Sequence, residues 1–242
     1  MSGVTEDTVY QGRVTLFQPE KGFRAGTDSL LLAAALPDRP GGEAVEFGCG
    51  CGGALFTAAC RLPDMRFIGV DMDIPMIELA RRGVAANGLE DRVSVYAASV
   101  EDWVHREENR FDLVFANPPY FEPGRISEPG EGKAGAYLET APLRSWLTSM
   151  HHTAKPRAPI ILIHRAAELS RILSILDNKV GELTVLPVAS KAGEDARRVL
   201  IRGRKGLKRG PTRLMAPLVL HEADGSPSPE LEAIRRGEAV AW

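Results

Sequence analysis

The chain has 242 residues, of which 44% are hydrophobic and 26% are charged, and its formal net charge is −2. These values are typical of a soluble globular protein, and no run approaches the about 20 apolar residues of a membrane span. The near-neutral charge also gives no overall nucleic-acid signature. The first residues are acidic and polar and do not form a secretory signal, so we expect a cytoplasmic protein without a membrane partner.

The cysteines predict neither disulfides nor a metal site. Cys49, Cys51 and Cys60 are too few and too clustered for a disulfide framework. A zinc site needs four convergent ligands, and the five histidines lie far from these cysteines in sequence. We therefore predict reduced thiols and no bound metal.

The chain opens with signals for a hairpin and a helix. Residues 12–28 contain a Pro-Glu-Lys-Gly turn between two β-prone runs, which predicts a hairpin. Thr27 or Asp28 is placed to cap a helix through residues 29–36.

From residue 41 onward, short apolar runs alternate with amphipathic ones. The amphipathic runs predict helices at 73–88 and 167–178, and alternation of strand and helix indicates a parallel sheet with right-handed crossovers. The link between the last two apolar runs is too short for a parallel crossover, so the final strand is expected to be antiparallel. The predicted strands are 44–48, 66–71, 93–98, 112–117, 159–165, 183–190 and 197–203.

We expect one domain over residues 1–242, in three parts. A hairpin and helix cap occupy 1–40, the core sheet 41–205 and a C-terminal tail 206–242. Residues 122–136 are rich in Gly, Pro and charge and predict a mobile loop that closes over a site.

A glycine-rich turn, VEFGCGCGG at 45–53, follows the first predicted sheet strand. Its glycines alternate as G-x-G-x-G, whereas dinucleotide-binding turns have the spacing G-x-G-x-x-G. Glu46 would repel a pyrophosphate but suits the cationic amino end of S-adenosylmethionine. Asp71 ends the next strand, where an acidic residue can accept hydrogen bonds from ribose hydroxyls. We favour S-adenosylmethionine over a dinucleotide, and a turn without a ligand is the third alternative.

The stretch FANPPYF at 115–121 ends another apolar strand with an amide side chain, two prolines and a tyrosine. The Asn117 side-chain oxygen and the Pro118 carbonyl can each accept one N–H of an adenine amine, which restores a nucleophilic lone pair on nitrogen. Pro119 helps to fix the carbonyl, and the Tyr120 ring can stack on a flipped-out base. A stiff turn in which Tyr120 only packs against the loop is the alternative.

Between Arg197 and Arg213 the chain has eight basic residues and no acidic one. Such a run favours contacts with RNA phosphates, although a solvated charged rim is the alternative. The residues predicted to contact RNA are Arg202, Arg204, Lys205, Lys208 and Arg209.

These motifs together resemble the class I S-adenosylmethionine-dependent methyltransferases, within them the N6-adenine group with an Asn-Pro-Pro-Tyr motif. VEFGCGCGG, GVDMD, AANGLEDRVSV and FDLVFANPPYF occur in that family's order. The wider resemblance, which includes GFRAGTDSLLLA and RRVLIRGRKG, is to bacterial tRNA(Val) adenine-37 N6-methyltransferases. It implies a Rossmann-like α/β fold with a mostly parallel sheet and N6 methylation of adenosine 37 in a tRNA.

The resemblance also implies roles for individual residues. The catalytic group would be Asn117, Pro118, Pro119 and Tyr120. The residues around the cofactor would be Thr27, Asp28, Glu46, Gly48, Cys49, Gly50, Asp71, Met72, Ser99, Val100 and Asn117. Relatives often carry an acidic residue at the position of Ser99, near the cofactor adenine.

Two other functions stay open at this point. Protein-glutamine N5-methyltransferases that act on release factors use the same four-residue motif on an amide nitrogen, but usually carry a helical domain before the sheet. A non-catalytic RNA-binding protein with the same fold would not need the intact motif.

Overall fold

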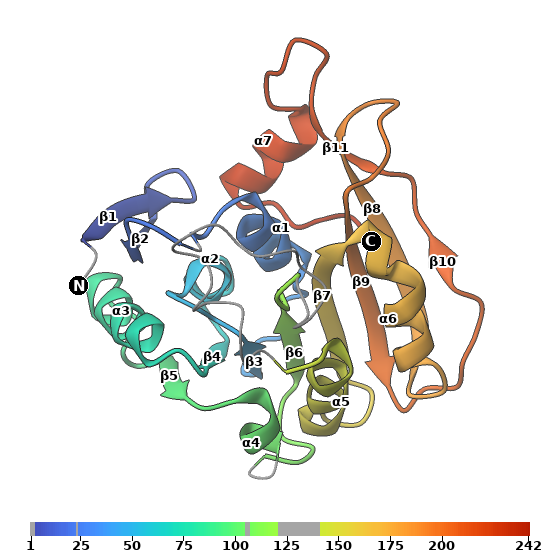
Figure 1. Cartoon of the computed structure of the whole chain (residues 1–242), viewed down its shortest axis with the longest axis horizontal. Helices are drawn as coiled ribbons and strands as arrows, with labels where there is room; N and C mark the ends of the chain where they lie inside the picture. Colours follow the sequence, from blue (N-terminus) through green and yellow to red (C-terminus); the bar gives the residue numbers. More distant parts are fainter. Residues whose placement is uncertain (1–2, 23, 105–106, 121–140) are drawn as a thin grey trace, which may run out of the picture.

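The computed structural model describes residues 3–22, 24–104, 107–120 and 141–242. They form a large mixed sheet, a separate two-stranded hairpin, and helices on both faces of the large sheet (Figure 1). No helix in these ranges is both long and apolar enough to cross a bilayer. The loop predicted at 122–136 lies outside the described residues.

The large sheet has the order β10-β8-β9-β7-β6-β3-β4-β5. Strand β11 also pairs with β8, further along that strand than β10 does. Strands β3, β4, β5, β6 and β7 are all parallel to one another. Strand β9 runs antiparallel to both of its neighbours, β7 and β8. The described strands of this sheet are β3 (Glu43–Phe47), β4 (Arg66–Asp71), β5 (Val93–Ala97), β6 (Leu113–Ala116), β7 (Pro159–Arg165), β8 (Val180–Lys191), β9 (Arg198–Lys205), β10 (Arg213–Leu214) and β11 (Leu218–His221).

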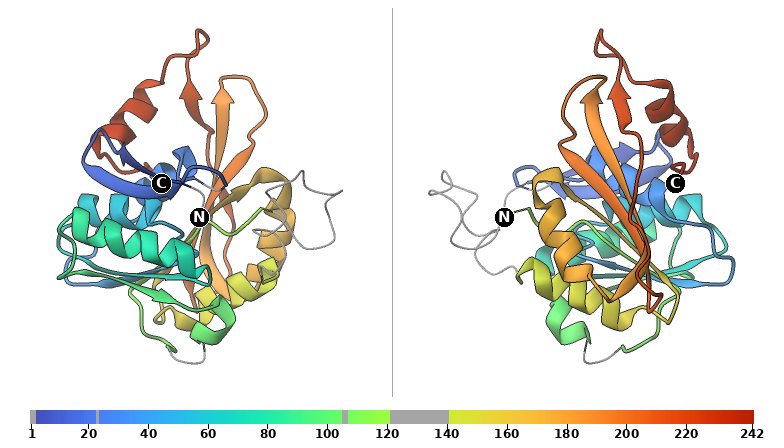
Figure 2. Two further views of the ribbon diagram at one scale, coloured as in Figure 1. Left: turned by 60° about the vertical axis from the view of Figure 1, so that its left-hand side comes forward. Right: turned by 90° about the vertical axis from the view of Figure 1, so that its right-hand side faces the viewer.

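Helices cover both faces of the large sheet (Figure 2). One face packs against α1 (Thr27–Ala35), α2 (Gly53–Arg61), α3 (Ile74–Ala86) and α7 (Pro229–Arg236). The other packs against α4 (Val100–Val104), α5 (Leu143–Thr153) and α6 (Leu169–Leu176), the last preceded by the 3-10 turn η1 (Ala166–Glu168). In β6, Phe115 faces the first cluster and Val114 the second. The central strands are mostly apolar, as expected for strands whose two faces are both buried, and Glu46 in β3 is an exception.

The predicted fold class is confirmed, and all seven strands predicted from apolar runs are present. The two short strands β10 and β11 were not predicted. They lie in the segment expected to be a tail, which also forms α7 and returns to α1, where the Val240 amide donates to the Ala34 carbonyl at 2.9 Å.

Two local predictions near the N-terminus are wrong. The hairpin exists, but it joins β1 (Val4–Val9) to β2 (Val14–Pro19) through a turn at residues 10–13, and the Pro-Glu-Lys-Gly segment follows it. Helix α1 is preceded by Gly26 as its N-cap residue, and no side chain caps it. Neither Thr27 nor Asp28 serves as the cap because both already lie inside the first helical turn.

Candidate active site

The carboxyl ends of β3, β4 and β6 meet at one edge of the sheet, because β3 lies between the other two and all three are parallel. The glycine-rich turn follows β3, Asp71 ends β4, and Asn117 follows β6. The strand order reverses at β3, and open α/β sheets bind their ligands at such a reversal.

The backbone of the glycine-rich turn packs against the end of β4. The amides of Gly48 and Cys49 both donate to the Val70 carbonyl, at 2.7 and 3.2 Å. Gly48 has a φ of 69°, and a Cβ there would lie 2.6 Å from the Trp146 ring. Only glycine fits this position, since a side chain would meet both the strained backbone and the indole.

Asp71 joins this turn to the start of α3. Its carboxylate accepts the Gly50 amide at 2.8 Å and the Asp73 amide at 2.9 Å. Burial, partly opposed by these hydrogen bonds, raises the pKa of Asp71 above its ordinary value. Met72 follows with 47% of its surface exposed and offers an apolar contact beside the carboxylate. The ribose role of Asp71 stays a prediction.

Glu46, predicted to face the amino end of the cofactor, is almost completely buried at this edge. Its side chain is only 2% exposed, and Oε2 has no hydrogen-bond partner. Burial, followed by repulsion from Asp71, raises the pKa of Glu46 well above its ordinary value of 4.5. A buried carboxyl of this kind is stabilised in its charged form only by a nearby cation or by further hydrogen bonds. The site therefore fits an ammonium group, which would supply both.

Glu46 and Asn117, which are 71 positions apart in the sequence, both line one small pocket. Gly48 and Cys49 line it as predicted. Burial raises the pKa of the Cys49 thiol, so this side chain lines the pocket as an uncharged thiol. The lining residues that the sequence did not indicate are Ala25, Ser29, Cys51, Gly53 and Ala54. Their shared signal is small size, which carries little information by itself.

The Asn117 side chain also presents an unsatisfied group. Its Oδ1 is buried and has no hydrogen-bond partner in the described structure. Because most buried side-chain oxygens are hydrogen-bonded, an orphan acceptor in a pocket indicates a donor that binds there. Pro118 is buried next to it, and Tyr120 is half-buried.

Tyr120 is oriented by groups from other elements. Its hydroxyl donates to the Asp28 carboxylate, and the Arg198 guanidinium carbon lies 4.8 Å from its ring centroid. The His164 ring meets it edge-on, with 5.1 Å between centroids. Arg198 and His164 were not predicted, because β7 and β9 carry them and the sequence does not show that these strands reach the motif.

Ser99, Val100 and Thr27 have other visible roles or positions. The Ser99 hydroxyl donates to Asp102 at 2.8 Å and accepts the Asp102 amide at 3.0 Å, so it caps α4. Val100 is buried in the core cluster that includes Trp103. Thr27 is exposed and does not line the pocket with Glu46. Their cofactor contacts stay predictions.

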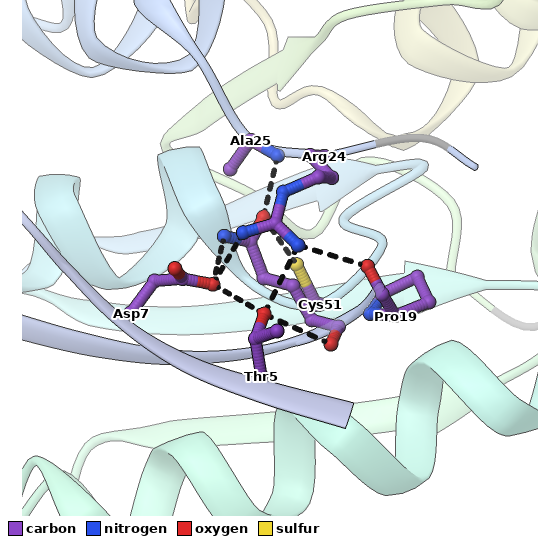
Figure 3. A network of polar contacts seen from close by, with 7 residues as sticks. Thr5, Asp7, Pro19, Arg24, Ala25 and Cys51 are labelled. Carbon is purple, nitrogen blue, oxygen red and sulfur yellow. Dashed lines mark hydrogen bonds and ion pairs between the residues drawn. The ribbon is translucent and has the colours of Figure 1, made fainter. Parts of the chain in front are cut away.

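The N-terminal hairpin is tied to the pocket through a polar network (Figure 3). Buried Gln18 accepts the Ala25 amide at 2.7 Å and donates to Asp7 at 3.0 Å. Arg24 pairs with Asp7 at 2.6 Å, and the Cys51 thiol reaches the Gln18 oxygen at 3.8 Å. The network holds Ala25, a pocket-lining residue, against the glycine-rich turn.

The basic run divides between the two ends of the sheet. Because β9 is antiparallel to β7, Arg198 lies opposite Arg165 at the site edge, whereas Arg204 lies opposite Pro159 at the far edge. Lys205 at that far edge donates to Asn109 at 2.7 Å. Arg209 pairs with Asp177 after α6, and the Arg202 guanidinium covers the Trp242 ring. The five residues do not form one patch beside Asn117, and their RNA contacts stay a prediction.

The profile of the methyltransferase small domain family matches residues 21–129, which span the pocket and the Asn-Pro-Pro-Tyr motif. The chain is also similar to curated relatives named tRNA1(Val) (adenine(37)-N6)-methyltransferase. The relative from Aeromonas hydrophila is 28% identical over 84% of this chain and 85% of its own length. The one from Porphyromonas gingivalis is 25% identical over 86% and 85%.

Solved structures share the fold. A predicted O-methyltransferase from Agrobacterium tumefaciens superposes with a TM-score of 0.72 and 24% identity, over 88% of this chain and 98% of that one. TYW2 from Pyrococcus horikoshii, solved in complex with MeSAdo, has a TM-score of 0.58 and 16% identity, over 86% and 73%. At these identities the likeness shows the methyltransferase fold alone.

Proposed function

We propose that the protein transfers a methyl group from S-adenosylmethionine to the N6 amine of an adenine, at adenosine 37 of a tRNA. The observation that carries the proposal is the pair of buried, unpartnered oxygens, Glu46 Oε2 and Asn117 Oδ1, in one pocket. The names of the curated relatives support the choice of tRNA and of the adenine position.

The residues around the pocket suit the cofactor. Glu46 would hold its amino group, the turn at Gly48 and Gly50 would border its methionine part, and Asp71 with Met72 would face its adenosine. When bound, S-adenosylmethionine supplies a methyl group on a positively charged sulfur. The ammonium group would stabilise the charged form of the Glu46 carboxyl, which burial alone disfavours and which the raised pKa of Glu46 reflects.

The chain's own contribution to the reaction is to hold the amine. Asn117 Oδ1 and the Pro118 carbonyl accept its two N–H groups, which draws the nitrogen out of conjugation with the ring and leaves its lone pair free. These fixed dipoles need no ionised base to start the transfer, so most of the rate gain comes from orientation and preorganised electrostatics. The nitrogen, positively charged once it is methylated, then releases one of its protons to water. The Tyr120 ring provides the surface on which a flipped base stacks.

The remaining assignments follow from this function. We take residues 1–242 as a single methyltransferase domain that works on tRNA in the cytoplasm. The RNA backbone would be held by the predicted basic residues, since phosphate contacts supply affinity without reading sequence.

The experiment that tests the proposal offers the protein three substrates in parallel with labelled S-adenosylmethionine: total tRNA, DNA and a release factor. We expect label in tRNA. Label in the release factor would replace the proposal with glutamine methylation, and label in none of the three together with normal cofactor binding would favour an RNA-binding protein that lacks activity.

A further inference from the structure

Tyr120 is held on three sides by residues from three separate elements. Asp28 in the first turn of α1 accepts a hydrogen bond from the Tyr120 hydroxyl. Burial, followed by the Asp28 charge, raises the pKa of Tyr120, so the hydroxyl keeps its proton. Arg198 at the start of β9 lies over the ring, 4.8 Å from its centroid. His164 near the end of β7 meets the ring at an interplanar angle of 70°.

Arg198 is hydrogen-bonded within this group, and 33% of its side-chain surface remains exposed. Its Nε donates to Asp28 at 3.0 Å, to the same carboxylate oxygen that accepts the Tyr120 hydroxyl. Its Nη1 donates to the Arg197 carbonyl at 3.3 Å. A planar guanidinium can make an in-plane hydrogen bond and cover an aromatic face together, which a lysine ammonium cannot. The preceding residue, Arg197, is exposed.

We propose that Arg198 is a positioning residue for methyl transfer, which acts with Asp28 to fix the plane of the Tyr120 ring. The inference rests on the proposed function, since the ring plane matters because a base must stack on it. A stacked base is presented to Asn117 at an angle set by the ring, and Arg198 removes the ring's freedom to turn about its side-chain bonds. Small errors in such an angle lower turnover strongly because the attacking nitrogen must be aligned.

A double-mutant cycle separates this role from direct contact with RNA. Arg198→Gln should lower the turnover of tRNA methylation by roughly tenfold through misalignment. In a Tyr120→Ala background the same substitution should have no further effect, because the ring on which Arg198 acts is gone. Arg198→Lys should restore only part of the turnover. Multiplicative effects of the two substitutions would overturn the inference, as would a lower salt dependence of tRNA binding in Arg198→Gln, which indicates a phosphate contact.

A second measurement does not depend on methylation. In protein labelled with 3-fluorotyrosine, the Tyr120 resonance is assigned by its loss in Tyr120→Phe. We expect Arg198→Gln to shift or broaden this resonance, and the matched control Arg197→Gln to leave it in place, in variants whose Tm shows that they fold. An unmoved resonance in Arg198→Gln overturns the positioning role. If wild-type protein methylates no RNA but the resonance moves, the proposed function fails while the arginine–tyrosine coupling stands.

Discussion

At the carboxyl edge of β3 and β6, Glu46 and Asn117 each keep a buried oxygen without a hydrogen-bond partner, whereas at the opposite edge of the same strands the charges are paired. There, Glu43 accepts two hydrogen bonds from Arg110, both at 3.0 Å. Asp112, just before β6, accepts the Lys155 ammonium at 2.7 Å. The carboxylates of Glu43 and Asp112 at the start of these strands are thus satisfied, whereas the oxygens of Glu46 and Asn117 at their ends are not, although the buried Arg39 Nε just before β3 also has no partner.

The difference separates groups kept for binding from groups kept for stability. An unsatisfied buried polar atom costs about 1–3 kcal/mol, so a fold retains one where a ligand completes it. The paired charges at the opposite edge are partly exposed, and each pair contributes about 1 kcal/mol or less. Substitutions at the two edges should therefore act on different quantities.

Asn117→Ala should give the largest effect. Loss of the oriented oxygen should lower turnover by about a hundredfold or more, as removal of one fixed dipole does at other active sites. Cofactor affinity should largely survive. The measurement is turnover with labelled S-adenosylmethionine and tRNA, and Asp112→Asn at the opposite edge is the control. Normal methylation by Asn117→Ala would contradict the amine-holding role.

Glu46→Gln should weaken cofactor binding and stabilise the free protein. A charge-assisted contact contributes about 1.5–3 kcal/mol, so we expect affinity to fall by about tenfold to a hundredfold. The raised pKa of Glu46 means that the folded state binds its proton more tightly, so its contribution to stability falls as pH rises above 4.5 and up to the folded-state pKa. The neutral variant lacks this loss and should have the higher Tm at pH 7. Calorimetry and thermal unfolding check the two effects, and a lower Tm would contradict the buried-charge assignment.

A related consequence concerns the wild-type protein. If Glu46 releases a proton on binding the cofactor, affinity should increase with pH until the pH exceeds the raised pKa of the free carboxyl. Calorimetric titrations in buffers of different ionisation enthalpy measure the proton directly. Glu46→Gln should release no proton, and equal release in both proteins would assign the proton to another group.

The far-edge cations give a smaller expected effect. Simultaneous replacement of Lys205, Lys208 and Arg209 by Gln should make tRNA binding less dependent on salt. The slope of log binding constant against log salt concentration should become shallower by roughly 0.7–0.9 for each lost phosphate contact. Cofactor affinity should not change. A salt titration that leaves the slope unaltered would place the RNA elsewhere, and those cations would then serve only their contacts within the protein.

Asp112→Asn should have the smallest effect and should change stability alone. Burial would raise the pKa of Asp112, but the hydrogen bonds from Lys155 and the Glu43 amide outweigh it and lower the pKa below 3.8. The group therefore stabilises the fold above pH 3.8, and this stability is lost as pH falls through the lowered pKa. We expect the variant to lose up to about 1 kcal/mol at pH 7, a loss that disappears in acid. Urea unfolding measures both, and reduced turnover would break the contrast between the edges.

The sequence was sufficient to predict the sheet and the position of the site edge. Apolar runs gave the strands, and parallel strand ends must meet, which brought Glu46 and Asn117 together without any knowledge of side-chain contacts. It was not sufficient where partners are distant in the chain. Arg198 reaches Tyr120 only because β9 runs antiparallel beside β7, and no local pattern encodes that contact.

The same antiparallel strand carries the residues of the basic run to both ends of the sheet, which the sequence alone does not reveal. Arg198 and Lys205 are seven residues apart in β9, so an extended strand separates them by roughly 24 Å and carries them to opposite edges. Ser99 shows a different limit, because its short hydroxyl side chain bonds to the neighbouring backbone and caps α4. The match of Ser99 to a family position does not reveal that its hydroxyl is already used to cap the helix.

The measurement that tests the central claim most directly is the position of the transferred methyl group. Total tRNA is incubated with the protein and S-adenosylmethionine that carries a deuterated methyl, digested to nucleosides and analysed by mass spectrometry. The account predicts the deuterated methyl on the exocyclic N6 of adenosine, because the two oxygens at Asn117 and Pro118 are placed to accept the N–H groups of an amine. A label on a ring nitrogen, a ring carbon or a ribose hydroxyl would contradict it.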